Sequence, residues 1–211
     1  MTHVRRKALA ILGVVLVPST LTAPVASAAT VDPPPAGVSI TVVSVSDGCE
    51  VGEVTVHPTS TKFTVHYWAF HALAGADTSP EDNQAKCQVV LRVNSAAGFT
   101  YAISGAQFVG SAELAAGASG EVKAQHGFAG TPPSQTWAHK LPGPHAAPFT
   151  FEDKTSLDQL VFNSCSERRD LTLDSELSVT AGTADPSKAN IMGMDTPDDY
   201  VTYDLFWKPC V

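Results

Sequence analysis

The stretch from Lys86 to Ile103 limits the fold more than any other part of the chain. It contains two runs that alternate between apolar and polar side chains, separated by small and polar residues at 94–98. The apolar positions are Val89, Leu91 and Val93 in the first run and Phe99, Tyr101 and Ile103 in the second. Alternation with a period of two, in β-branched and aromatic residues, is typical of strands that bury one face. The stretch therefore predicts a β-hairpin.

Similar alternation recurs along the chain, most clearly at 171–180. About ten such short runs, with glycine and proline between them, predict an all-β, antiparallel β-sandwich of the jelly-roll type. We expect only two short helical turns, one after Ser79-Pro80 and one after Ser156, where serine precedes typical first-turn residues. Residues 129–150 are rich in proline and glycine, and we interpret them as a long surface loop with one short strand.

The first 28 residues have the pattern of a secretory signal peptide. A basic segment at 5–7 precedes an apolar run at 8–17, and Ala26-Ser27-Ala28 fits the small-residue cleavage motif. The apolar run is well short of the roughly 20 residues that span a bilayer. We therefore expect a secreted, extracellular protein in which 1–28 are removed, 29–37 form a proline-rich lead-in and 38–211 form one domain.

Charge narrows the range of partners. Three of the 13 basic residues lie at positions 5–7, so the secreted chain keeps 10 basic against 21 acidic residues, a net charge of −11. Such an acidic balance disfavours nucleic acid and anionic membrane surfaces as partners. Once the signal peptide is cleaved, we expect no attachment to the membrane.

The four cysteines all lie in the exported part, and none has C-x-x-C spacing. In an oxidising compartment an even number of such cysteines favours disulfides over a zinc site. Three pairings are possible, and the sequence does not choose among them. Our prediction is the sequential pairing, Cys49–Cys87 and Cys165–Cys210.

Several short motifs occur in a fixed order along the chain. They are Gly48-Cys49, Lys86-Cys87-Gln88, Leu91-Arg92-Val93, Gly98-Phe99-Thr100-Tyr101-Ala102-Ile103, Ala181-Gly182-Thr183, Asp185-Pro186-Ser187, Met194-Asp195 and Trp207-Lys208. In this order they resemble a family of secreted bacterial and fungal proteins known as domain of unknown function 4360. The likeness spans essentially the whole mature chain and implies export, four cysteines and one β-rich domain. The family has no established activity, so the resemblance transfers no catalytic residue.

Catalytic motifs are absent from the sequence. The nearest approach to G-x-S-x-G, at 117–120, falls in a predicted hairpin turn, whereas a nucleophile elbow needs a strand-to-helix turn. Asp174 and Glu176 could form a carboxylate pair for glycoside hydrolysis, but they occupy the solvent-facing side of their strand. His126 shares the apolar phase of its strand, and we interpret it as a buried structural histidine rather than a general base. We predict no cofactor and no catalytic residue.

Metal binding has one acidic candidate. Asp195, Asp198 and Asp199 could offer oxygen ligands to calcium. They lack the glycine and the final glutamate of an EF-hand loop, and such a segment is also typical of an exposed turn.

Two tryptophans are the candidates for a binding surface. Trp68 has the opposite phase to its apolar neighbours and lies near His66, while Trp137 lies near His139 in the proline-rich segment. A tryptophan on a polar strand face or in a loop can stack on a sugar ring or on a partner's side chain. The alternative is that both tryptophans cover a second, partly buried face of the sandwich. Trp207 is in the apolar phase, which predicts a place in the core.

These observations favour a non-catalytic extracellular binding or structural module, with polysaccharide or protein as the candidate partner. Two alternatives remain open at this point. One is a secreted hydrolase with an unrecognised active site. The other is a secreted inhibitor or interaction protein that acts through the loop at 129–150.

Overall fold

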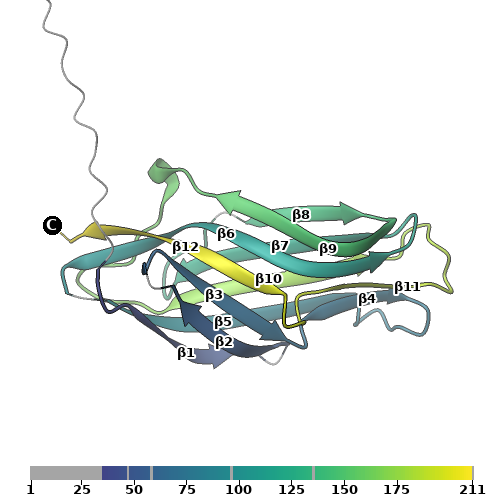
Figure 1. Cartoon of the computed structure of the whole chain (residues 1–211), viewed down its shortest axis with the longest axis horizontal. Coiled ribbons are helices and arrows are strands. Elements are labelled where there is room, and N and C mark those ends of the chain that lie inside the picture. The colour runs from purple at the N-terminus through teal and green to yellow at the C-terminus, as the bar shows by residue number, and fades with distance from the viewer. Residues whose placement is uncertain (1–34, 47, 58, 96, 135, 211) are drawn as a thin grey trace, which may run out of the picture. The chain divides into compact units, whose positions relative to one another are not determined.

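The computed structural model describes residues 35–46, 48–57, 59–95, 97–134 and 136–210. These residues form twelve strands in two antiparallel sheets and one 3-10 helix, η1 (Leu157–Gln159). Figure 1 shows how the strands are arranged. The predicted all-β sandwich with almost no helix is confirmed. No helix within the described residues is both long and apolar enough to cross a membrane. The predicted signal peptide and most of the lead-in lie outside the described residues.

The first sheet has five strands, in the order β1-β5-β10-β7-β8. Their bounds are β1 (Ser39–Val45), β5 (Gln84–Asn94), β10 (Leu171–Thr180), β7 (Ser119–Phe128) and β8 (Trp137–Pro142). The central strand β10 alternates strictly between buried and half-exposed residues up to Val179. One face of this sheet therefore covers the core and the other faces solvent.

The second sheet has seven strands, and its longest strand is β6 (Phe99–Leu114). On one side β6 pairs with β12 (Tyr200–Pro209) and, further along, with β11 (Ala189–Gly193). On the other side it pairs with β9 (His145–Lys154), which forms an edge of the sheet. The remaining strands are β2 (Glu50–Val56) and β3 (Lys62–Trp68), which extend the sheet beyond β12, and β4 (His71–Gly75), which pairs with β11.

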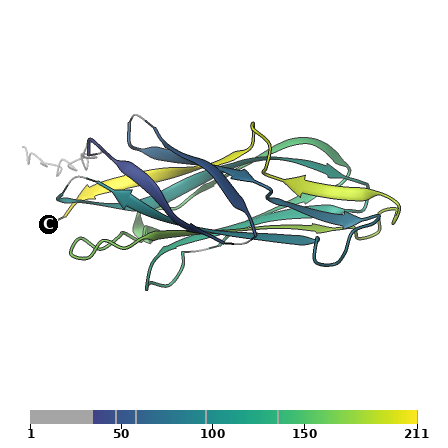
Figure 2. The same cartoon turned by 90° about the horizontal axis from the view of Figure 1, so that it is seen from below.

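The core lies between the inner faces of the two sheets, which Figure 2 shows from a second direction. It is rich in aromatic rings: Phe63 stacks on Tyr203 at 5.1 Å between ring centroids, and Tyr101 lies 5.3 Å from Trp207. Trp207 is buried, as its phase predicted, and its Nε1 donates a hydrogen bond of 2.7 Å to the carbonyl oxygen of Ser60. Each such side chain removed from water contributes roughly 1.5–3 kcal/mol to folding.

The hairpin predicted for 86–103 is wrong. β5 pairs with β1 and β10, whereas β6 pairs with β12, β11 and β9, so these consecutive strands belong to different sheets. The predicted apolar faces are nevertheless turned toward the core. Alternation reports which face of a strand is buried, but it does not report which strand lies beside it.

Residues 129–150 contain the one short strand that we predicted, which is β8, and also the first part of a second strand, β9, in place of the rest of the loop. β8 lies at the edge of the five-stranded sheet and β9 at the edge of the other, with a cis peptide bond at Gly143–Pro144 between them. The chain therefore crosses from one sheet to the other at this point (Figure 1). Edge strands tolerate proline because one of their sides makes no ladder hydrogen bonds.

Of the two predicted helical turns, one is present. The turn after Ser156 is η1, whereas residues 80–83 form a turn without a helix. In that turn the backbone N–H of Ser79 donates to the Asp82 carboxylate at 2.7 Å, so the side chain stabilises the turn itself.

The predicted disulfide pairing is confirmed. The first disulfide, Cys49–Cys87, joins the connection between β1 and β2 to β5, with 5.3 Å between the Cα atoms. The second disulfide, Cys165–Cys210, joins the segment after η1 to the end of β12, with 5.8 Å between the Cα atoms. Both cross-links tie elements that are far apart in the sequence.

Candidate functional site

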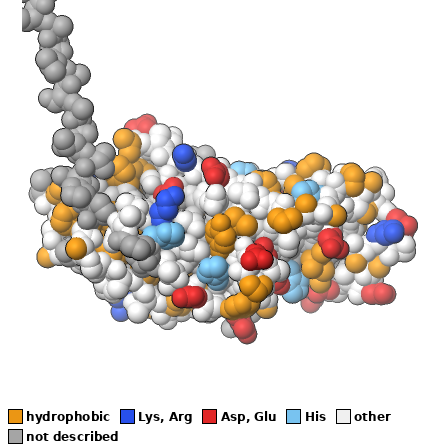
Figure 3. All heavy atoms as spheres, viewed as in Figure 1, with side chains coloured by type: hydrophobic (Ala, Val, Ile, Leu, Met, Phe, Trp, Pro, Cys, Tyr) orange, Lys and Arg blue, Asp and Glu red, His pale blue; other side chains and the backbone are white. Residues whose placement is uncertain are grey.

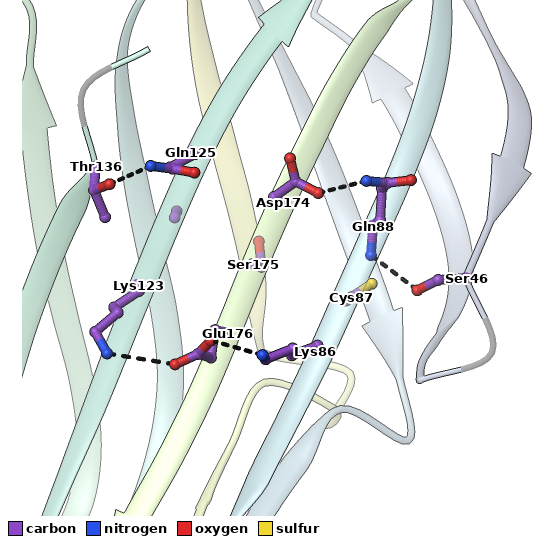
Figure 4. A pocket seen from close by; sticks show the side chains of 11 residues that line it. Ser46, Lys86, Cys87, Gln88, Lys123, Gln125, Thr136, Asp174, Ser175 and Glu176 are labelled. Carbon is purple, nitrogen blue, oxygen red and sulfur yellow. Dashed lines mark hydrogen bonds and ion pairs between the residues drawn. The ribbon is translucent and has the colours of Figure 1, made fainter. Parts of the chain in front are cut away.

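An open groove of about 510 Å³ crosses the outer face of the five-stranded sheet, over β5, β10 and β7 (Figure 4). Side chains alternate along these strands, so Cys87, Ser175 and Ala124 point into the core while their neighbours point outward. We call this feature the polar groove, and its outward side chains are Lys86, Gln88, Lys123, Gln125, Asp174 and Glu176, with Ser46 and Thr136 at the rims.

Strand register aligns the six outward side chains into two rows. Asp174 lies directly opposite Gln88 on one side and Gln125 on the other. Glu176, two residues further along β10, lies opposite Lys86 and Lys123 in the same way. Each row therefore has one carboxylate in the middle and a hydrogen-bond donor on either side (Figure 4).

The row that contains Asp174 is held by hydrogen bonds within the protein. Gln88 Nε2 donates to Asp174 Oδ1 at 2.8 Å, and Gln125 Nε2 donates to the hydroxyl of Thr136. The backbone N–H of Gln88 donates to Ser46 Oγ at 2.9 Å, which connects the rim to β5. These contacts orient both amides before a ligand arrives.

The row that contains Glu176 is held by ion pairs. Glu176 lies 3.6 Å from Lys86 Nζ and 3.4 Å from Lys123 Nζ, and Lys123 also reaches Glu121 at 3.1 Å. Hydrogen bonding and charge attraction, first from Glu121 and then from Glu176, raise the pKa of Lys123 above its ordinary value. The two lysines that line the groove balance Asp174 and Glu176, while Glu121, just outside the lining, adds one negative charge beside Lys123.

These contacts suit binding better than acid catalysis. A glycosidase holds its general acid protonated in a partly buried, apolar site. Glu176 instead contacts two ammonium groups, and Asp174 accepts a hydrogen bond from an amide.

Trp68 lies on the outer face of the other sheet and is 42% exposed. Its indole packs against the backbone of Gly52 on β2, where a Cβ atom would lie only 1.7 Å from Nε1. His66 shares this face, and its ring lies 5.9 Å from that of Tyr200. Figure 3, viewed from the side of β3 and β12, shows histidine, acidic and hydrophobic side chains intermixed.

Trp137 and His139 lie elsewhere and face inward. Trp137 is 7% exposed and packs edge-on against Phe108, because alternation along β8 turns it toward the core. His139 stacks on Phe151 at 4.6 Å, and its Nε2 lies 2.6 Å from Asp153 Oδ2. The four residues that the sequence singled out for binding therefore do not form one surface, and the indole of Trp137 is not available to an external ligand.

The acidic segment near β12 does not converge on one point. Asp199 is buried and its carboxylate accepts a hydrogen bond from the N–H of Thr196 at 3.1 Å, whereas Asp198 is exposed. Asp195 instead lies 2.7 Å from His71 Nδ1. Within the described ranges no three histidine, cysteine or acidic side chains are grouped as metal ligands. The calcium hypothesis thus lacks the cluster of oxygen atoms that it requires.

The sequence did not reveal the pair His71 and Asp195 or the polar groove. The pair is 124 residues apart in the chain and meets because β4 lies beside β11. The groove depends on the order β5-β10-β7, which brings together three segments that each look like an ordinary solvated strand. In the sequence, the only indication of the groove is that these polar residues alternate with the apolar residues of each strand.

Residues 36–210 match the family model described as a domain of unknown function, DUF4360. The chain belongs to this family. The match covers most of the chain and confirms the resemblance noted in the sequence.

One similar protein is described as secreted and has no defined function. An uncharacterized secreted protein from Arthroderma benhamiae is 26% identical over 139 residues, which cover 64% of this chain and 54% of that protein. The chain thus matches about half the length of this relative.

Three solved structures have a distant likeness to this DUF4360 chain. TmCBM61 in complex with β-1,4-galactotriose is 10% identical with a TM-score of 0.27, over 84% of this chain and 92% of that one. A family 11 carbohydrate-binding module from Clostridium thermocellum is 8% identical with a TM-score of 0.27, over 79% and 88% of the two chains. A chain of broad bean stain virus is 10% identical with a TM-score of 0.30, over 67% and 87%. Similarity this low carries no argument about ligand or function.

Proposed function

We propose that this chain is a secreted, non-catalytic binding module for extracellular polysaccharide, and that the polar groove is its binding surface. The observation that carries the proposal is the pair of aligned rows, in which Asp174 and Glu176 are each flanked by donors on two neighbouring strands. Export is supported by the signal-peptide pattern at 1–28 and by the secreted fungal relative.

Sugar hydroxyl groups fit the chemistry of this surface. Each hydroxyl both donates and accepts hydrogen bonds, and the groove offers amide and ammonium donors beside carboxylate acceptors. Because Gln88 already contacts Asp174 and Gln125 already contacts Thr136, a ligand finds both amides oriented. Specific sites usually combine a few polar groups that are fixed in this way.

The shape of the groove also favours a polymer. It is an open depression on a sheet face, not an enclosed pocket. A polysaccharide can therefore lie in it while the rest of the polymer continues past the protein. The secreted hydrolase considered above would need an acid or nucleophile in a sheltered cleft.

A sedimentation assay tests the proposal. Mature, oxidised protein would be mixed with insoluble chitin, cellulose, peptidoglycan and β-glucan, and the pelleted fraction measured. We expect selective pelleting with at least one polymer. The double variant Gln88→Ala and Gln125→Ala should weaken it by about tenfold or more, since each lost hydrogen bond is worth roughly 1 kcal/mol.

Two further variants locate the surface. Gln107→Ala is the matched control, because Gln107 is a hydrogen-bonded glutamine on the outer face of the other sheet, and it should pellet like the wild type. Trp68→Ala tests the exposed indole. Pelleting with no polymer, unchanged pelleting of the double variant, or loss through Trp68→Ala alone would each contradict the proposal.

Export has a separate test. Expression of the full chain in a secreting host should release protein into the medium with Ala29 at its N-terminus. Retention of the uncleaved chain in the cell would contradict secretion.

A further inference from the structure

We infer that the polar groove takes a neutral, linear glycan that lies across the strands, with one sugar unit over each of β5, β10 and β7. The inference rests on the proposed function and adds the charge, direction and length of the ligand. Three observations support it: the direction of the two rows, the spacing of the strands and the pairing of the charges.

The direction follows from strand register. Gln88, Asp174 and Gln125 form one row across three strands, and the row of Lys86, Glu176 and Lys123 runs parallel to it. The rows are two residues apart along each strand, which is roughly 7 Å. A glycan that runs between the two rows meets polar side chains on both sides at every strand. A glycan that runs along one strand meets each row only once.

The length follows from strand spacing. Neighbouring strands lie about 4.8 Å apart, which is close to the length of one pyranose unit in an extended glycan. The three central strands therefore match three consecutive units. The hydroxyls of Ser46 and Thr136 stand at the two ends and can each contact one unit more.

The charge follows from the pairing within the groove. Glu176 is shared between two lysines, and Asp174 accepts a hydrogen bond from Gln88. A uronic acid would have to compete with Glu176 for the lysines, and an amino sugar would have to compete with the lysines for Glu176. A neutral sugar can instead add its hydroxyls to contacts that already exist. The acidic charge of the secreted chain further disfavours anionic polymers.

Calorimetric titration with defined oligosaccharides tests the inference. The probes are cello-, laminari- and N-acetylchito-oligosaccharides of one to six units, each at low and high sodium chloride. Charged probes are chitosan oligomers and oligogalacturonate of matched length. In one neutral series we expect affinity to rise by about tenfold or more from two to four units and to level off by five. Added salt should change this affinity by less than about twofold.

A charge variant sharpens the test. Glu176→Gln removes the carboxylate between Lys86 and Lys123, so Lys86 loses its ion pair with Glu176 and Lys123 keeps the one with Glu121. The variant should bind oligogalacturonate more tightly than the wild type does and should still bind the neutral series. Lys140→Gln changes a charge on β8 outside the groove and should leave all probes unaffected.

Failure of this inference can be told apart from failure of the proposed function. If a polymer pellets through the groove but affinity does not depend on oligomer length, or a charged probe binds more tightly than every neutral one, only the inference is overturned. If no polymer pellets and no oligomer binds, both are overturned. An unchanged probe preference in Glu176→Gln would also count against the inference.

Discussion

Acid should destabilise this protein through one buried histidine, His126. Its side chain is on the inner face of β7, with the residue 5% exposed and the ring 5.1 Å from that of Trp137. The Nδ1 atom lies 3.1 Å from Ser134 Oγ. Burial disfavours the charged imidazolium and lowers the pKa of His126 from 6.5 to about 4.

The direction of the effect follows from proton linkage. In the unfolded chain His126 faces water and takes up a proton near pH 6.5, whereas in the folded protein it does so only near pH 4. Between these values the unfolded state binds the extra proton, so the free energy of unfolding rises with pH. The contribution of neutral His126 is complete above pH 6.5 and declines as the pH falls to 4. One pKa unit corresponds to about 1.4 kcal/mol, so the full loss is roughly 3 kcal/mol.

Urea unfolding at several pH values between 7 and 4.5 measures this loss. The comparison is with His126→Gln, which has a polar amide but does not titrate. The wild type should lose about 2–3 kcal/mol more than the variant over this range. A His145→Gln variant controls for removal of a histidine from a less buried place. Parallel pH profiles for the wild type and His126→Gln would refute the reasoning.

Three other predictions concern the core, the exposed indole and the disulfides. Trp207→Phe leaves the carbonyl of Ser60 without its donor and should lower the free energy of unfolding by about 1–3 kcal/mol, whereas an unchanged urea midpoint would contradict it. Gly52→Val should push the Trp68 indole into solvent and increase acrylamide quenching of its fluorescence, so unchanged quenching would argue against the packing. The first and second disulfides close spans of 38 and 45 residues, so replacing the cysteines of either pair by serine should cost about 4 kcal/mol in urea unfolding. Only loss of the first, whose Cys87 lies beneath the polar groove, should also weaken groove binding.

Local patterns predicted the burial of strands well. The run at 171–180 is observed as β10 with the same bounds, because a strand with one wet and one dry face must alternate. The disulfide pairing was also predicted correctly, although sequence alone allowed two other pairings. Alternation is a property of each strand by itself, and four cysteines allow only three pairings. Both features can therefore be predicted without knowing how the strands are arranged.

Strand partners could not be predicted in the same way. β5 and β6 follow each other closely, yet β5 pairs with β10, whose residues come about 80 positions later, as the pair Leu91 and Leu171 shows. Residues 129–150 were interpreted as a loop with one short strand, and that strand is β8, but most of β9 was missed because proline usually interrupts central strands and β9 is an edge strand. Trp137 was a candidate for either a binding surface or a partly buried face, and it is buried.

The polar groove escaped prediction because its chemistry depends on pairing. Asp174 and Glu176 were identified in the sequence as an ordinary solvated pair, and each alone is still only a half-exposed carboxylate. Their setting changes when β5 and β7 align on either side of β10 and place a donor at each flank. A site of this kind leaves no motif, since the spacing that matters runs across strands and not along the chain.

The groove lies on the central strands of its sheet, and this position affects how tightly it can bind the proposed glycan. β10 has a neighbour on both sides, so the directions of Asp174 and Glu176 are fixed by two ladders of backbone hydrogen bonds. Contacts with Gln88, Lys86 and Lys123 then restrict the rotamers of both carboxylates. Binding usually costs roughly 0.5–1.5 kcal/mol for each flexible side chain that becomes ordered. Because much of that ordering exists before the ligand arrives, each additional sugar unit should add most of its hydrogen-bond energy to the affinity, and chain length should control the strength of binding.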